Sequence, residues 1–199
     1  LPEGMSADQI VAGFGAVIER AWNPFVERYH KEIEQTQATW RYVVDNIRSY
    51  IDQYRSEPST LLHGDVHLEN ILFTSDPSRP MVIIDWGLAG KGLAVQDVSH
   101  FLIGNLPPEE RRKHEHDLLT GYYSNLSSRL TSKYSFDQFF LDNRAALLRS
   151  LVRPILASGS AFHSDDSDPI LDVADVLVER MNAAIIDLDP VGAMKELGY

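Results

Sequence analysis

The sequence predicts an α+β fold in which helices form most of the chain and a small β-hairpin platform carries the candidate active-site loops. Apolar residues recur at helical spacing before residue 56 and again after residue 97. Short β-like runs lie between these helical regions, at 60–62, 71–73 and 81–84. No repeat, low-complexity tract or linker interrupts the pattern, so we expect a single folded unit.

The N-terminal region reads as two helices. Ser6 and Gln9 form a capping box, and apolar residues follow them at helical spacing. Pro24 should kink or end this first helix, because proline removes a backbone hydrogen bond. A second helical pattern runs from Trp40 to Tyr54 and stops at the breaker segment 56–59.

The middle of the chain reads as the β platform. A turn at 76–80, rich in Asp, Ser and Pro, separates the β-like runs 71–73 and 81–84 and predicts a hairpin. The three glycines that follow, Gly87, Gly90 and Gly92, indicate a flexible loop.

The C-terminal region returns to helix. We expect a short helix from Asp97 to Ile103 and another that starts at Pro107-Pro108. A capping box at Ser135 to Gln138 opens a third helix, which should end near Pro154. Asp168-Pro169 is an N-cap with proline at the first helical position, and it predicts the last long helix.

Polar residues with kinase-like spacing follow two of the β-like runs. Asp65 and Asn70 come after 60–62, and Asp85 comes directly after 81–84. A carboxylate beside an acceptor hydroxyl can take its proton, and amide and carboxylate oxygens suit Mg²⁺. The offset from Asp65 to Asn70 is that of the protein-kinase pattern H-R-D-x-x-x-x-N, with Gly64 in place of Arg.

Two stretches carrying these residues, HGD at 63–65 and IDWGLAGKGLAVQDVSHFL from Ile84 onward, resemble the aminoglycoside phosphotransferase and choline kinase-like family. In that family an aromatic residue follows the metal-binding Asp, and Trp86 matches it. The resemblance implies a protein-kinase-like lobe and ATP-dependent transfer of the γ-phosphoryl group to a hydroxyl of a small molecule. Aminoglycoside, choline and sugar-like acceptors all fit, and the implied cofactors are ATP and Mg²⁺.

The resemblance also implies a role for each candidate residue. Asp65 would be the catalytic base that orients and deprotonates the acceptor hydroxyl. Asn70 and Asp85 would bind Mg²⁺. His63 would brace the catalytic loop with its ring, and Asp97 would accept hydrogen bonds from that loop.

A kinase of this type also has a β-rich nucleotide-binding lobe with a Gly-rich loop and a strand Lys. The residues before Leu61 read as helix, and Gly13-Phe14-Gly15 is more simply a helix with small residues than a nucleotide loop. We therefore interpret residues 1–199 as the C-terminal lobe of a larger phosphotransferase. We expect this lobe to be inactive alone.

Other functions remain open. A kinase-like binding module without catalysis would not need all three polar residues. A metal-dependent hydrolase could use His63, Asp65 and His67 as an H-x-D-x-H cluster, but the remaining histidines show no matching motif. A protein kinase is disfavoured by Gly64 and by the lack of an Ala-Pro-Glu segment.

Composition narrows the partners. The net charge of −11 disfavours nonspecific binding to nucleic acid or anionic membranes, and it is compatible with a cationic acceptor. The acidic loop at 165–168 could meet such an acceptor, although a solvated loop explains it more simply. The chain has no Cys, no recognisable signal peptide and no apolar run of membrane-spanning length, so we expect a cytoplasmic protein.

Overall fold

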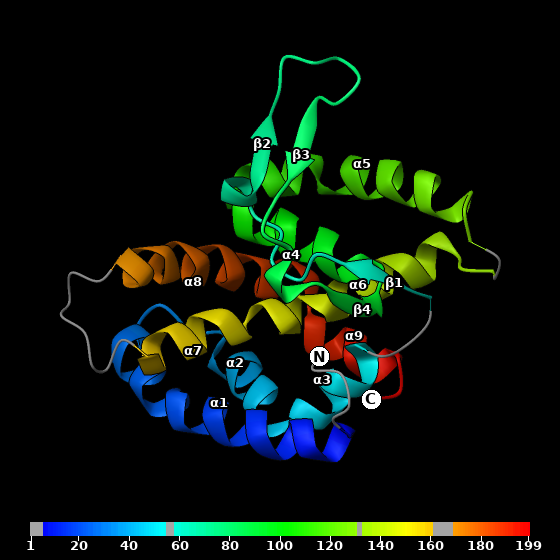
Figure 1. The fold of residues 1–199 in the computed structure, drawn as a ribbon. Coiled ribbons are helices and arrows are strands. Elements are labelled where there is room, and N and C mark those ends of the chain that lie inside the picture. The colour runs from blue at the N-terminus through cyan, green and yellow to red at the C-terminus, as the bar shows by residue number, and fades with distance from the viewer. Residues whose placement is uncertain (1–5, 55–57, 131–132, 161–168) are drawn as a thin grey trace.

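The computed structural model describes residues 6–54, 58–130, 133–160 and 169–199, and it confirms the predicted fold class, a mainly helical α+β lobe (Figure 1). The longer helices are α1 (Ala7–Tyr29), α4 (Val95–Asn105), α5 (Pro108–Ser127), α6 (Phe136–Ser150) and α8 (Pro169–Leu188). The shorter ones are α2 (Gln37–Asp45), α3 (Ile47–Tyr54), α7 (Val152–Ser160) and α9 (Pro190–Glu196). The strands are β1 (Ser59–Leu62), β2 (Ile71–Phe73), β3 (Met81–Ile83) and β4 (Gly90–Leu93), with 3₁₀ turns η1 (Leu68–Asn70) and η2 (Trp86–Leu88).

Helix α1 begins at the predicted capping box of Ser6, but it does not end at Pro24. The helix continues through Pro24 to Tyr29. Proline removes one hydrogen bond of the helix, but Phe25 and Tyr29 after it are buried, and their burial offsets that loss. Phe25 is fully buried, with its ring centroid 4.8 Å from that of Trp40. Tertiary packing therefore overrides the local signal.

Two other predicted helices are each divided into two shorter helices. The pattern from Trp40 to Tyr54 breaks at Asn46, whose side chain donates a hydrogen bond to the carbonyl of Tyr42. The helix expected to end near Pro154 ends at Ser150 instead, and Pro154 lies in the first turn of α7, where proline is tolerated. The N-cap predicted at Asp168 lies outside the described residues.

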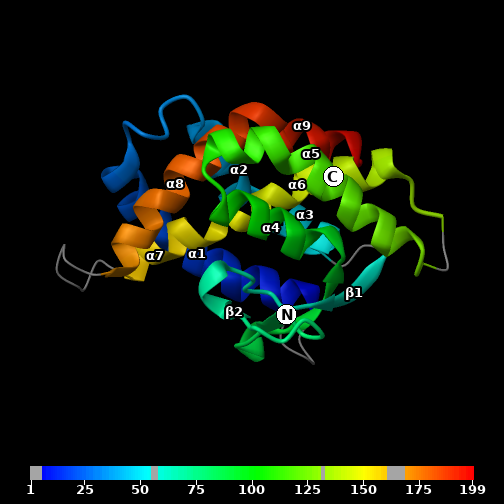
Figure 2. The ribbon, with the colours of Figure 1, turned by 90° about the horizontal axis from the view of Figure 1, so that it is seen from above.

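The β platform consists of two antiparallel pairs, β1 with β4 and β2 with β3. The prediction of a flexible loop at the three glycines is wrong, because Gly87 lies in η2 and the other two lie in β4. There Gly90 pairs with Leu62 and Gly92 pairs with Thr60, since β1 supplies the hydrogen-bonding edge. The hairpin β2–β3 projects from the helical body (Figure 1) and lies at the opposite edge from α9 when seen from above (Figure 2).

The helices pack mainly as two pairs. Helix α1 packs along α7, and α4 packs along α6. The largest apolar side chains that are fully buried in the core are Trp40, Phe25, Phe139, Ile18 and Ile33. Among the described residues, no helix is both long enough and apolar enough to cross a bilayer.

Candidate active site

The segment after β1 (residues 63–67), which we call the catalytic loop after the role expected for Asp65, is fixed by Asp97 in the first turn of α4. Asp97 accepts two backbone hydrogen bonds, from His63 N to Oδ2 at 2.6 Å and from Gly64 N to Oδ1 at 3.1 Å. One carboxylate thus satisfies two consecutive amides of a loop that contributes to no sheet or helix. The loop takes its position from α4.

The ring of His63 links this loop to the segment after β3. The backbone amide of Asp65 donates to Nδ1 at 3.3 Å, so the ring proton lies on Nε2. Nε2 donates to the carbonyl of Ile84 at 2.8 Å, and the ring meets that of Trp86 edge-on at 4.8 Å. His63 is 3 % exposed, so it joins these two loops from within the fold.

Gly64 is required at its position by two constraints. Its φ is +83°, and a Cβ placed on it would lie 2.3 Å from the carbonyl oxygen of Leu88. The carbonyl of Gly64 accepts a hydrogen bond from Arg149 at 3.0 Å, and the same guanidinium lies 3.8 Å from Asp97. Arg149 of α6 thus binds both the loop and Asp97, and the sequence did not reveal this contact.

Asp65 and Asn70 are in contact through the catalytic loop. The side-chain nitrogen of Asn70 donates to the backbone carbonyl of Asp65 at 3.0 Å, which leaves its Oδ1 as the atom suited to a cation. The backbone carbonyl of Asn70 accepts a hydrogen bond from Ile84 at 2.9 Å, across the base of the hairpin. Asp85 is the next residue after Ile84, so the hairpin register brings the Asn70 and Asp85 backbones to one end of the platform.

Asp85 has an unusual backbone conformation. Its φ and ψ are 59° and 64°, in the left-handed region that non-glycine residues seldom occupy, and Gly87 N donates to its Oδ1 at 3.4 Å. A strained backbone persists only where the surrounding structure holds it, and such positions cluster at ligand-binding sites. The exposed carboxylate of Asp85 and the amide oxygen of Asn70 are hard oxygen donors, so they fit the ligand chemistry of Mg²⁺.

The cluster of His63, Asp65 and His67 does not form a metal site. His67 Nε2 lies 3.7 Å from Asp65 Oδ2, but His63 directs its Nε2 to a backbone carbonyl. Across residues 6–54, 58–130, 133–160 and 169–199, no three His, Asp or Glu side chains gather as metal ligands would. The hydrolase alternative therefore lacks its ligand set in this part of the chain.

Arg153 and His100, which sequence patterns did not single out, complete the surroundings of Asp65. Arg153 of α7 forms an ion pair with Asp65 Oδ1, and its Nη1 lies 3.1 Å from His100 Nε2. His100 is buried in α4, with Nδ1 3.0 Å from the hydroxyl of Ser150. The only available signal was the spacing of Arg149 and Arg153, four residues apart across the α6–α7 junction.

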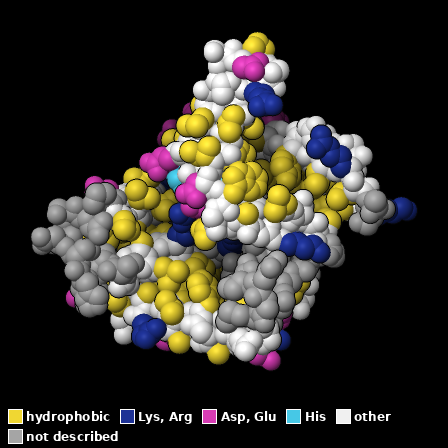
Figure 3. Space-filling view, in the orientation of Figure 1, with side chains coloured by type: hydrophobic (Ala, Val, Ile, Leu, Met, Phe, Trp, Pro, Cys, Tyr) yellow, Lys and Arg dark blue, Asp and Glu magenta, His cyan; other side chains and the backbone are white. Residues whose placement is uncertain are grey.

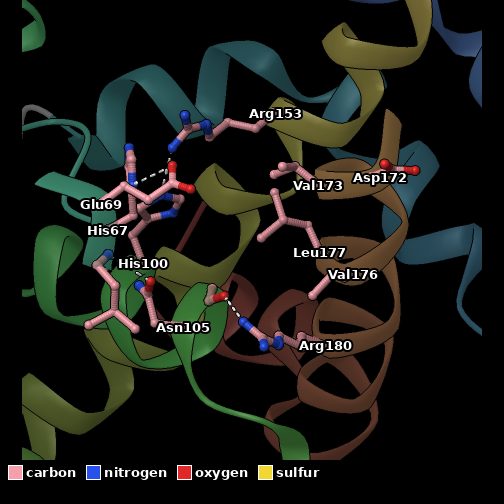
Figure 4. Close-up of a pocket in the computed structure, with 12 residues that line it drawn as sticks. His67, Glu69, His100, Asn105, Arg153, Asp172, Val173, Val176, Leu177 and Arg180 are labelled. Carbon is pink, nitrogen blue, oxygen red and sulfur yellow. Dashed lines mark hydrogen bonds and ion pairs between the residues drawn. The ribbon is translucent and has the colours of Figure 1, made fainter. Parts of the chain in front are cut away.

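A pocket of about 430 Å³ opens beside Arg153 and His67 (Figure 4). Figure 4 shows α8 opposite them, contributing Val173, Val176 and Leu177. The remaining lining residues come from η1, α4 and α8, and they are Leu68, Glu69, His100, Gly104, Asn105, Asp172 and Arg180. The volume lies within the range of roughly 300–1,000 Å³ typical of small-molecule sites.

Burial of His100 should make the protein sensitive to acid. Burial, and then the charges of Arg153 and Arg149, lower the pKa of His100 to about 3, whereas the unfolded chain titrates near 6.5. Between these values the unfolded state binds more protons, so stability is lost as pH falls, by up to about 1.4 kcal/mol per pH unit. We expect urea denaturation of His100→Gln, which keeps hydrogen-bonding groups, to show a shallower loss than the wild type between about pH 7 and about pH 5. If the wild type and His100→Gln lost stability equally between these pH values, His100 would not be the source of the acid sensitivity.

In a comparison with protein-family models, residues 4–133 match the family described as ecdysteroid kinase-like. This family is kinase-like and related to the choline kinases and aminoglycoside phosphotransferases, so the resemblance found in the sequence holds at that broader level. No curated protein sequence matches the chain. The matched region contains the catalytic loop, the hairpin and Asp97, and the chain belongs to the ecdysteroid kinase-like family.

Proposed function

We propose that this chain is the C-terminal lobe of an ATP-dependent phosphotransferase that phosphorylates a hydroxyl of a small molecule. The observation that carries the proposal is the fixed catalytic loop, which holds Asp65 beside a pocket while Asn70 and Asp85 come from the adjoining hairpin end. In the proposed reaction the hydroxyl oxygen of the acceptor attacks the γ-phosphorus of ATP, and ADP leaves. Asp65 accepts the proton of that hydroxyl. Asn70 and Asp85 would hold Mg²⁺, which neutralises charge on the nucleotide phosphates.

A second lobe over the hairpin is part of this proposal. Large apolar side chains that are 38–76 % exposed cluster on β1, η1, the hairpin and η2, and Figure 3 shows apolar side chains gathered around the hairpin. They are Leu61, Leu68, Leu72, Phe73, Met81, Val82, Ile84, Trp86 and Leu88. Contiguous apolar surface of this kind usually marks an interface. A nucleotide-binding lobe packed on it would place ATP next to Asn70 and Asp85.

The pocket supports an acceptor with an apolar body. Its walls include Leu68, Val173, Val176 and Leu177, and its charged residues balance, with Arg153 and Arg180 against Glu69 and Asp172. A net-neutral, apolar pocket favours an uncharged alcohol over the cationic aminoglycoside or choline acceptors. The steroid class in the family's description is therefore the first acceptor to test. The acidic loop expected to meet a cation lies outside the described residues.

The test is phosphoryl transfer by the whole gene product with Mg-ATP and three acceptors: a polyhydroxylated steroid, an aminoglycoside and choline. The expected result is a phosphate monoester of the steroid, identified by mass spectrometry, and no product without Mg²⁺. Transfer to choline or to the aminoglycoside would overturn the acceptor assignment while leaving the kinase function intact. Binding of Mg-ATP without transfer to any alcohol would instead favour the non-catalytic binding module.

Residues 1–199 alone should show no measurable turnover. Positioning of the nucleotide phosphates supplies most of the rate enhancement in phosphoryl transfer, and in our proposal the second lobe provides it. Calorimetry with Mg-ATP should accordingly detect only weak binding to this chain. Micromolar affinity would mean that the nucleotide site is complete within these residues and that the lobe assignment is wrong.

A further inference from the structure

Arg153 makes the two oxygens of Asp65 inequivalent. Oδ1 is buried and forms the ion pair with Arg153. Oδ2 lies on the other side of the carboxylate, 3.7 Å from His67 Nε2. His67 and Arg153 both line the pocket (Figure 4), and both contact the carboxylate of Asp65, which therefore lies directly behind this part of the pocket wall. Since Oδ1 is already paired, Oδ2 is the oxygen that can receive a hydroxyl proton.

Arg153 is itself held in place from behind. The low pKa of His100 keeps its ring neutral, so one ring nitrogen must donate and the other must accept. Nδ1 lies 3.0 Å from the hydroxyl of Ser150 and serves as the donor, which leaves the lone pair of Nε2 for the guanidinium of Arg153 at 3.1 Å. A protonated ring could not accept this bond and would repel the guanidinium. The buried neutral histidine thus fixes a side chain that is 45 % exposed.

Arg149 and Arg153 bind different parts of the catalytic loop. Arg149 binds the loop backbone through the carbonyl of Gly64, whereas Arg153 binds the side chain of the next residue, Asp65. Fixing the backbone alone would still leave the carboxylate free to rotate about its side-chain bonds. The ion pair with Arg153 removes this freedom, and a carboxylate set at the right angle is what proton transfer requires.

We propose that Arg153 is a positioning residue, which fixes Asp65 Oδ1 so that Oδ2 faces the acceptor hydroxyl in the pocket. This role rests on the proposed phosphotransferase function and adds to it a residue outside the family match, which ends at residue 133. Arg153 itself transfers no proton. Its contribution is to orientation, so its loss should act on kcat and leave nucleotide binding unchanged.

The test compares Arg153→Met, Arg153→Lys and Arg153→Ala in the whole gene product. Arg153→Met should lower kcat by roughly 10- to 100-fold, the size expected for a misplaced catalytic group, with little change in KM for ATP. Arg153→Lys should recover part of the loss, because it restores the charge without the planar guanidinium. Added ethylguanidinium should raise the turnover of Arg153→Ala, an effect that a merely structural role would not produce.

The matched control is Arg112→Met. Arg112 is exposed to a similar degree, 50 %, and also pairs with an aspartate, Asp187, but it does not line the pocket. It should keep wild-type kcat. An active wild type with unchanged Arg153→Met turnover would overturn the positioning role alone, and a faster Arg153→Met would show that Arg153 restrains Asp65 instead. A wild type that transfers no phosphoryl group would overturn both the function and this role.

Discussion

Replacing Asp65 with Asn should lower kcat of the whole gene product by about 10²-fold or more. The substitution keeps the size and hydrogen bonding of the side chain but removes its charge, and a positioned general base contributes on the order of 10²–10⁴. Affinity for ATP should hardly change, because the side chain of Asp65 faces His67 and Arg153 at the pocket. Steady-state kinetics of phosphoryl transfer, with ATP and acceptor varied separately, would measure both effects.

Asp85→Asn is the matched comparison, since it makes the same chemical change at the proposed metal ligand. It should weaken the metal site, so added Mg²⁺ should restore part of the activity, whereas Asp65→Asn should not respond. The opposite pattern of magnesium response would exchange the two roles. Wild-type turnover in both variants would place the active site elsewhere in the protein.

Gly64→Ala should damage both stability and turnover. The left-handed conformation costs a residue with a Cβ roughly 1–2 kcal/mol, and the new Cβ would also overlap the carbonyl oxygen of Leu88 at 2.3 Å. Relief of this overlap must move backbone, and a displacement of about 1 Å in a catalytic group can cost about 10²-fold in rate. Urea denaturation should show the lower free energy of unfolding, and kcat should fall with it.

Gly13→Ala provides the control for this prediction. Gly13 lies in α1, and a Cβ added there would meet open space, with no atom within 4 Å outside its own turn of the helix. Because alanine favours helix over glycine by about 0.8–1.0 kcal/mol, this variant should be as stable as the wild type or more stable. If Gly64→Ala kept the stability and kcat of Gly13→Ala, the close contact with Leu88 would affect neither folding nor turnover.

Local signals explain which parts of the fold could be predicted. Residues close in sequence determine the cap at Ser6 and the hairpin, so short-range patterns predict both. The spacing of Asp65, Asn70 and Asp85 can likewise be read directly from the sequence. The helix through Pro24 was missed because burial of Phe25 and Tyr29, which no local rule contains, decides its course.

Long-range contacts explain what the sequence did not reveal at the site. Arg149 reaches Gly64 across 85 residues, and Arg153 reaches His100 across 53. Neither contact produces a periodicity or a motif, because the partners meet only after α4, α6 and α7 have packed. The roles expected for Asp65, Asn70, Asp85, His63 and Asp97 remain predictions, and Asp65→Asn and Asp85→Asn test those of Asp65 and Asp85.

The pocket wall on α8 has a consequence for acceptor specificity. The catalytic loop, the hairpin and Asp97 all lie within the region matched by the family, whereas Val173, Val176 and Leu177 lie beyond it. Substitutions in the α8 wall therefore need not disturb the hydrogen bonds that the amides of His63 and Gly64 donate to Asp97. If the pocket binds the acceptor as we propose, substitutions on α8 should change the acceptor that is used while the catalytic chemistry is kept, and libraries that vary α8 would test this directly.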